Sequence, residues 1–182
     1  MPLYVAFLRG INLGNRRIKM ADLKTRFEEI GFEEVATFIA SGNVVFKTRA
    51  QSAASLETKI ETHLRRAFGY EVETFIRSAE EIREVLSFTP FRRTLQPGNT
   101  LCVAFLKEPL GIQAAKALEA VRTDADEFRA HGKEFFWFTQ AGLSDSVVWD
   151  LPQAKALQLP SSTLRNINTV RKLAEKHGFG GA

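Results

Sequence analysis

The sequence contains few of the residues that carry metal-binding and nucleophilic chemistry. Its 182 residues include one cysteine, Cys102, and three histidines. A single cysteine excludes a disulfide within the chain and is typical of the reducing cytoplasm, where we expect this protein to reside. His63, His131 and His177 stand alone, without cysteines or carboxylates at the spacing of metal ligands. We therefore expect no metal site and no cofactor.

Long apolar runs and a strong excess of one charge are also absent. No stretch approaches the ~20 apolar residues of a membrane-spanning helix, and the first residues lack the basic leader of a signal peptide. The 25 basic and 21 acidic residues give a net charge of only +4. This excess allows an anionic ligand but is far from the basic stripe of a dedicated nucleic-acid-binding protein. The composition, 45% hydrophobic and 25% charged, is that of an ordinary soluble globular protein without membrane segments.

Apolar periodicity in the first half predicts four strands and two helices in the order βαββαβ. The strands are expected over residues 3–8, 35–40, 44–46 and 72–76, and the helices over residues 20–30 and 56–68. This order is the split-βαβ or ferredoxin-like arrangement. Ser41-Gly42-Asn43 predicts a tight hairpin turn. Ser78 with Glu81 forms the sequence pattern of a capping box and predicts a third helix that ends before Pro90.

A linker is expected at residues 92–99, which include Pro97-Gly98. After it the pattern repeats, with a strand over 101–107, a helix over 112–121, and strands over 127–130 and 134–138 joined by a turn at 131–133. We therefore predict an α+β fold of two ferredoxin-like halves, residues 1–91 and 100–182, the second less regular. A C-terminal helix is expected to be capped by Asn168 or Thr169.

Nucleophilic catalysis is not favoured by any residue of the sequence. Cys102 falls inside a predicted buried strand, where an inert core thiol is the better interpretation. Ser41 has no neighbouring histidine to act as its base, so a role in the turn is favoured. The aromatic run 135–138 is interpreted as core and hairpin surface rather than as a platform for stacking bases.

Two polar segments near the ends of the chain, residues 9–19 and 163–169, are the best candidates for a binding site. Each places arginine and asparagine at the edge of a regular element, where they can bind an anion or another loop. The first precedes a predicted helix start, whose free N–H groups favour an anion. A solvated loop and an ordinary helix cap explain the same residues without a ligand. The candidate ligand-binding residues are Arg9, Gly10, Asn12, Gly14, Arg16, Lys19, Ser41, Asn43, Arg165, Asn166, Asn168 and Thr169.

These residues carry a resemblance to a known family. The sequence resembles the bacterial family named domain of unknown function 1697 (DUF 1697), and the order and spacing match along the whole chain. The N-terminal match comprises Leu8-Arg9-Gly10-Ile11-Asn12-Leu13-Gly14, Lys19-Met20, Gly31-Phe32, Thr37 and Ser41-Gly42-Asn43-Val44-Val45-Phe46. The C-terminal match comprises Thr163, Arg165-Asn166 and Asn168-Thr169. The resemblance implies paired ferredoxin-like α+β units and no established activity.

The sequence departs from the family pattern at four positions. Asn15 replaces a common glycine, Phe38 and Ala40 replace a tyrosine and a glutamine, and Ile167 replaces a tryptophan. A mechanism that needs a phenol at position 38 or an amide at position 40 therefore cannot operate here. The arginines and asparagines that remain are hydrogen-bonding groups rather than bases, and they suit binding better than proton transfer.

Three functions remain open from the sequence. The leading hypothesis is binding of a phosphorylated or otherwise anionic ligand, a nucleotide or nucleic acid included, where residues 9–19, 41–43 and 165–169 converge. The second is hydrolysis of a small phosphate compound, by analogy with ferredoxin-like acylphosphatases, with Arg9 and Asn43 positioning phosphate and water. The third is a structural or protein-interaction role. RNA binding through a sheet face ranks lower because the aromatic signature is missing, and the oligomeric state stays open.

Overall fold

Two four-stranded antiparallel sheets organise the protein, in a computed structural model that describes residues 1–39, 42–49, 52–92 and 95–179. The chain forms two units: unit 1 comprises Met1–Glu84 with Lys172–Ala182, and unit 2 comprises Val85–Arg171. This arrangement confirms the predicted α+β class with two ferredoxin-like halves. None of the described helices is long and apolar enough to cross a membrane.

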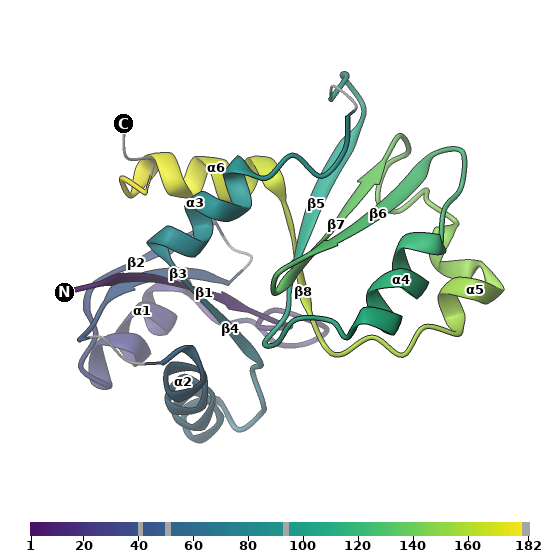
Figure 1. The fold of residues 1–182 in the computed structure, drawn as a ribbon. Coiled ribbons are helices and arrows are strands. Elements are labelled where there is room, and N and C mark those ends of the chain that lie inside the picture. Colours follow the sequence, from purple (N-terminus) through teal and green to yellow (C-terminus); the bar gives the residue numbers. More distant parts are fainter. Residues whose placement is uncertain (40–41, 50–51, 93–94, 180–182) are drawn as a thin grey trace. The chain divides into compact units, whose positions relative to one another are not determined.

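Unit 1 has the predicted βαββαβ order, followed by a further helix. Its elements are β1 (Leu3–Leu8), α1 (Met20–Glu29), β2 (Glu33–Phe38), β3 (Asn43–Lys47), α2 (Ala53–Phe68), β4 (Thr74–Ser78) and α3 (Ala79–Ser87). The strands are ordered β2-β3-β1-β4, and α1 and α2 cover one face of the sheet (Figure 1). Because β1 pairs with both β3 and β4, it lies in the interior of the sheet and is buried almost throughout.

Alternate residues of β1 face opposite sides of this sheet. Tyr4, Ala6 and Leu8 belong to the core beneath α1 and α2, together with Phe27 and Phe46. The rings of Phe27 and Phe46 meet edge to face at 5.6 Å, and Phe32 stacks on Phe46 at 4.3 Å. The period of two in the strand and the apolar faces of the two helices therefore generate the core.

The C-terminal residues of unit 1 contact the sheet at Phe38, the last residue of β2. His177 packs edge to face on the Phe38 ring at 6.3 Å, and the Lys176 ammonium lies 5.5 Å from the centre of that ring. The Arg83 side chain of α3 donates to the carbonyl of Phe179 at 3.4 Å. Residues from opposite ends of the sequence therefore complete one unit.

Strand β4 is an edge strand whose outward N–H groups are bound by carboxylates. Thr74 N donates to Glu61 at 2.9 Å, Ile76 N donates to Glu57 at 3.1 Å, and Ser78 N donates to Glu81 at 2.8 Å. Glu81 N donates in return to Ser78 Oγ at 3.1 Å, which confirms the predicted capping box. The three glutamates occupy the positions where a further strand would otherwise pair.

Unit 2 repeats this order with shorter helices in its second part. Its elements are β5 (Thr100–Phe105), α4 (Ile112–Ala120), β6 (Asp126–His131), β7 (Glu134–Thr139), the 3-10 turn η1 (Val148–Asp150), α5 (Pro152–Lys155), β8 (Thr163–Asn166) and the start of α6 (Ile167–Lys176). The order of the strands is β6-β7-β5-β8, and α4 and α5 lie on one side of the sheet (Figure 1). The predicted hairpin between β6 and β7 is confirmed, with Gly132 at φ +57° in the turn.

A buried carboxylate holds the loop after β7 to the sheet of unit 2. Asp126 accepts hydrogen bonds from Thr123 Oγ1 at 2.6 Å, Trp137 Nε1 at 2.9 Å and Ser146 Oγ at 2.8 Å. Burial raises the pKa of this carboxyl, but the hydrogen bonds outweigh burial, so the pKa of Asp126 lies below its ordinary value. Asp126 therefore stays ionised and joins two segments that are far apart in sequence.

Removal of the Glu57 carboxylate tests the role of the edge-strand acceptors. Glu57→Ala leaves the N–H of Ile76 without this acceptor, and we expect a loss of about 1–3 kcal/mol in the free energy of unfolding. Glu57→Gln keeps an amide oxygen at the same place and should lose less. Urea unfolding of the two variants measures the difference, and equal losses would contradict the role of the acceptor oxygen.

Candidate functional site

The β1–α1 loop carries four exposed cations that follow β1 closely in the sequence. Arg9 donates to Glu73 at 3.1 Å, and its backbone N donates to the carbonyl of the same residue. The Arg16 guanidinium lies 4.0 Å from the centre of the Tyr70 ring, a cation–π geometry. Arg17 donates to the carbonyl oxygens of Gly14 and Arg16. These contacts shape the loop while each of the cationic side chains stays accessible to solvent.

The start of α1 completes this loop. Asn12 Oδ1 accepts from the backbone N of Ile18 at 2.8 Å, which closes the loop onto itself. Gly10 and Gly14 adopt φ of +69° and +60°, so the positive φ expected of these glycines is present. Lys19 is the N-cap residue of α1, but its side chain makes no capping hydrogen bond. The N–H groups of the first turn are therefore not capped by the side chain at this position.

The loop and the β2–β3 turn are in contact within unit 1. Leu8 N donates to the carbonyl of Gly42 at 2.8 Å, and a Cβ atom on Gly42 would lie 2.9 Å from Ile11 Cγ2. Asn43 is fully buried, and its amide donates to the carbonyl of Phe38 at 2.9 Å. Asn43 therefore stabilises the hairpin. Ser41 lies outside the described residues.

Thr163–Asn166 forms strand β8, an element that was not predicted from the sequence. Arg165 is only 9% exposed and donates to Thr163 Oγ1 at 2.7 Å and to the carbonyl of Leu164 at 2.9 Å. Burial lowers the pKa of Arg165 to about 10, which still leaves it charged at neutral pH. The hydrogen bonds replace part of the hydration that this charge loses.

The capping residue of α6 also differs from the expectation. The helix begins at Ile167, and Asn166 Oδ1 accepts from Asn168 N at 2.9 Å, so Asn166 rather than Asn168 or Thr169 is the cap. The Asn168 side chain accepts from Arg171 at 2.7 Å, and Thr169 lies half-buried in the first turn. Residues 165–169 belong to unit 2 and residues 9–19 to unit 1, and their convergence in one cleft stays a prediction.

A second buried arginine, Arg77, was missed from the sequence. Arg77 stands opposite Val5 in β4, and Arg165 stands opposite Val103 in β8. Each guanidinium donates to the carbonyl of the residue before it, at 2.8 Å in Arg77 and 2.9 Å in Arg165. The two arginines therefore occupy equivalent positions in the two halves. The signal in the sequence was an arginine at a similar place before a helix in each half, in β4 before α3 and in β8 before α6.

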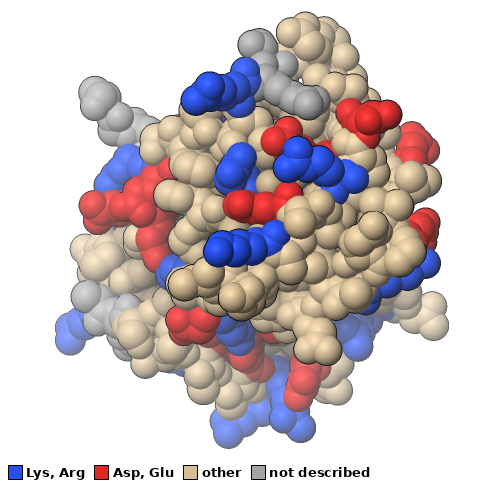
Figure 2. Space-filling model, turned by 45° about the vertical axis from the view of Figure 1, so that its right-hand side comes forward, with Lys and Arg blue, Asp and Glu red and all other residues tan. Residues whose placement is uncertain are grey.

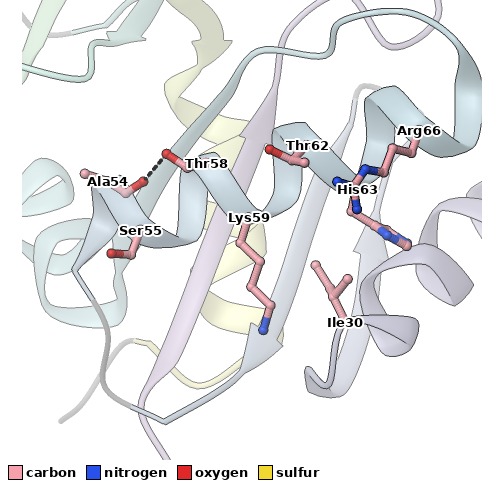
Figure 3. A pocket seen from close by; sticks show the side chains of 8 residues that line it. All are labelled: Ile30, Ala54, Ser55, Thr58, Lys59, Thr62, His63 and Arg66. Atoms are coloured by element: carbon pink, nitrogen blue, oxygen red, sulfur yellow. Dashed lines mark hydrogen bonds between the residues drawn. The ribbon is translucent and has the colours of Figure 1, made fainter.

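A groove of about 600 Å³ runs along α2 beside the end of α1, and its residues were also missed from the sequence. Figure 3 shows Lys59, His63 and Arg66 projecting from one side of α2 toward Ile30. The hydroxyl residues Ser55, Thr58 and Thr62 complete the polar lining. Their spacing of three or four residues places them on one helix face, a pattern that also describes an ordinary solvated face.

Neither a reactive thiol nor a metal cluster is found in the described part of the chain. Cys102 is fully buried in β5, and burial raises the pKa of its thiol to about 11. No three residues among the described histidines, cysteines and carboxylates are grouped so that they could hold a metal ion. The rings of 135–138 are all buried in β7, which confirms the predicted core role but places none of them on the hairpin surface.

The fold is that of two ferredoxin-like units, with a buried arginine as the second-to-last residue of the equivalent strand in each. The chain belongs to the family described as protein of unknown function (DUF1697), whose model matches residues 1–136. Among solved structures it is similar to the conserved bacterial protein SP0830 from Streptococcus pneumoniae. The identity is 25% and the TM-score 0.73, over 97% of this chain and 98% of that one. Comparison with curated proteins gives no match.

Substitution of Gly42 tests the contact between the β1–α1 loop and the β2–β3 turn. Gly69 provides a matched control because it also has positive φ, +79° against +76°, but has open space around it. We expect Gly69→Ala to lose about 1–2 kcal/mol of unfolding free energy from backbone strain. Gly42→Ala should lose about 1–3 kcal/mol more, since the new methyl group meets Leu8 and Ile11. Similar losses in both variants would show that the close approach of Gly42 to Leu8 and Ile11 does not affect stability.

The Cys102 thiol should be unreactive in the folded protein. At pH 8, three units below a pKa of about 11, roughly one thiol in a thousand is ionised, and burial hinders access as well. Reaction with an aromatic disulfide reagent at pH 8 should therefore be slow in buffer and fast in guanidinium chloride. A rapid stoichiometric reaction of the native protein would contradict the buried position.

Proposed function

We propose that the β1–α1 loop binds an anionic, phosphorylated small molecule. The observation that carries this proposal is the concentration of Arg9, Arg16, Arg17 and Lys19, all exposed, in the eleven-residue span 9–19 before a helix start. Arg9 has an ion-pair partner in Glu73. Among the described residues, Arg16, Arg17 and Lys19 form no ion pair.

The position of these cations favours an oxyanion. The first turn of α1 contributes N–H groups and the positive end of the helix dipole, and its N-cap residue makes no side-chain hydrogen bond to them. Guanidinium groups add bidentate donors with the geometry of a phosphate. Asp22 is the one carboxylate in the first turn, so cations outnumber carboxylates around the loop.

The hydrolase alternative receives less support. It assigns to Asn43 the positioning of water or phosphate, but this amide is fully buried and donates to the Phe38 carbonyl. A purely structural role accounts for Asn12, Asn43 and Asn166, each of which binds a backbone group. It does not account for Lys19, whose exposed side chain forms no ion pair with any described residue.

Nucleic acid is a weaker candidate than a small phosphorylated compound. Figure 2 shows basic and acidic side chains interspersed over the face in view, among the residues that the structure describes. A nucleic-acid-binding surface requires a continuous path of positive charge. A short loop with four cations suits a ligand with one or two phosphate groups better.

Ligand-dependent thermal stability of the whole chain tests this proposal. The panel comprises inorganic phosphate, nucleotides, sugar phosphates, acyl phosphates and short RNA and DNA oligomers. We expect a dose-dependent rise in Tm for a phosphorylated small molecule, since a ligand at 100 times its Kd stabilises by about 2.7 kcal/mol. Lys19→Ala and Arg16→Ala should each reduce the rise.

Lys24→Ala is the matched control, because Lys24 is exposed on α1 and pairs with Glu28 away from the loop. It should leave the rise in Tm unchanged. The proposal fails if no phosphorylated compound raises Tm, or if the rise persists at full size in both loop variants.

A further inference from the structure

The groove along α2 is lined by cations that are separate from those of the β1–α1 loop. Two permanent cations, Lys59 and Arg66, line it together with His63, and the lining includes no carboxylate. Within the described chain neither Lys59 nor Arg66 forms an ion pair. The groove shares no residue with the loop, so it is a separate feature of unit 1.

Glu29, at the end of α1, contacts the groove residue His63, but its negative charge is balanced by Arg26. Arg26 donates to its two oxygens at 2.8 and 3.0 Å, and His63 Nε2 lies 2.9 Å from Oε2. The hydrogen bond from Arg26 lowers the pKa of Glu29 despite the opposing effect of desolvation, and His63 lowers it further. Glu29 therefore holds the His63 ring in place rather than opposing a negative ligand.

The end of α1 does not oppose an anion strongly either. Helix C-termini carry partial negative charge on their last carbonyl groups. Here Gly31 N donates to the carbonyl of Glu28 and Phe32 N donates to the carbonyl of Phe27. The Lys59 ammonium lies 5.0 Å from the centre of the Phe32 ring, so an aromatic face supports this cation beside the groove.

The spacing of the two cations selects the length of the ligand. Lys59 and Arg66 are seven residues apart, which corresponds to about 10.5 Å along a helix axis. His63 lies between them, and Thr62 adds a hydroxyl to the lining. A ligand with several linked phosphates can span this separation and bind both cations. A volume of about 600 Å³ lies within the range of ligand pockets.

From this arrangement we infer that the α2 groove is a second anion site, for an elongated ligand with several linked phosphate groups. The terminal phosphates are held by Lys59 and Arg66, and the central part lies against His63 and the hydroxyl residues. Ile30 supplies an apolar wall for the rest of the ligand. The site is independent of the loop site proposed above.

Titration of the whole chain with phosphate chains of increasing length tests this inference. The probes are orthophosphate, pyrophosphate and tripolyphosphate at constant ionic strength, followed by amide chemical shifts in two-dimensional NMR and by calorimetry. Tripolyphosphate should bind at least tenfold more tightly than orthophosphate and should shift the amides of residues 54–66. Lys59→Ala and Arg66→Ala should each weaken its binding by about fivefold or more, since each removes a charge-assisted hydrogen bond.

Two control variants separate this site from general charge attraction and from the loop. Arg65→Ala removes another exposed cation on α2, one that pairs with Glu71 outside the groove, and it should change affinity by less than twofold. Lys19→Ala should leave tripolyphosphate binding at α2 unchanged. The inference is overturned if Arg65→Ala weakens binding as much as Arg66→Ala, if shifts are confined to residues 9–19, if affinity does not depend on chain length, or if tripolyphosphate does not bind.

Discussion

The fold of unit 1 depends on the hydrogen bonds made by the outward-facing backbone N–H groups of β4. An edge strand exposes N–H groups that must bind water, another strand or a side chain. Here Glu57 and Glu61 of α2 and Glu81 of α3 bind three of these groups. The same contacts fix α2 against the sheet and set where α3 starts. Because β4 pairs with β1, they also stabilise the register that places Arg77 opposite Val5.

The arrangement of β4 and α3 recurs in β8 and α6, and this recurrence explains most of the polar residues at 163–169. β8 corresponds to β4, α6 follows it as α3 follows β4, and Arg165 corresponds to Arg77. Each arginine donates to a backbone carbonyl, and Arg165 also donates to Thr163 Oγ1, so these hydrogen bonds compensate part of the hydration that the buried charge loses. Conspicuous polar residues therefore serve the architecture here, and we propose ligands only for the exposed cations before α1 and along α2.

The sequence predicted the strands and helices in which apolar residues are buried and polar residues are exposed. It missed the strand in which a polar residue is buried and an apolar one is exposed. The apolar runs around Val5 and Val103, the turns at Gly42 and Gly132, and the capping box at Ser78 each have one physical interpretation. β8 does not, since Leu164 is exposed while Arg165 is buried. The groove cations were missed for a related reason. Charged residues at helical spacing look like a solvated face until α1 is placed beside them.

One further consequence follows from the return of the chain to unit 1 at Lys172. A nascent chain leaves the ribosome from its N-terminus, so β1 to β4 emerge long before the residues that contact Phe38. Throughout synthesis of unit 2 the ring of Phe38 lacks His177 and Lys176, and Arg83 lacks the carbonyl of Phe179. Unit 1 therefore begins to emerge first but can complete its contacts only after unit 2 has been synthesised.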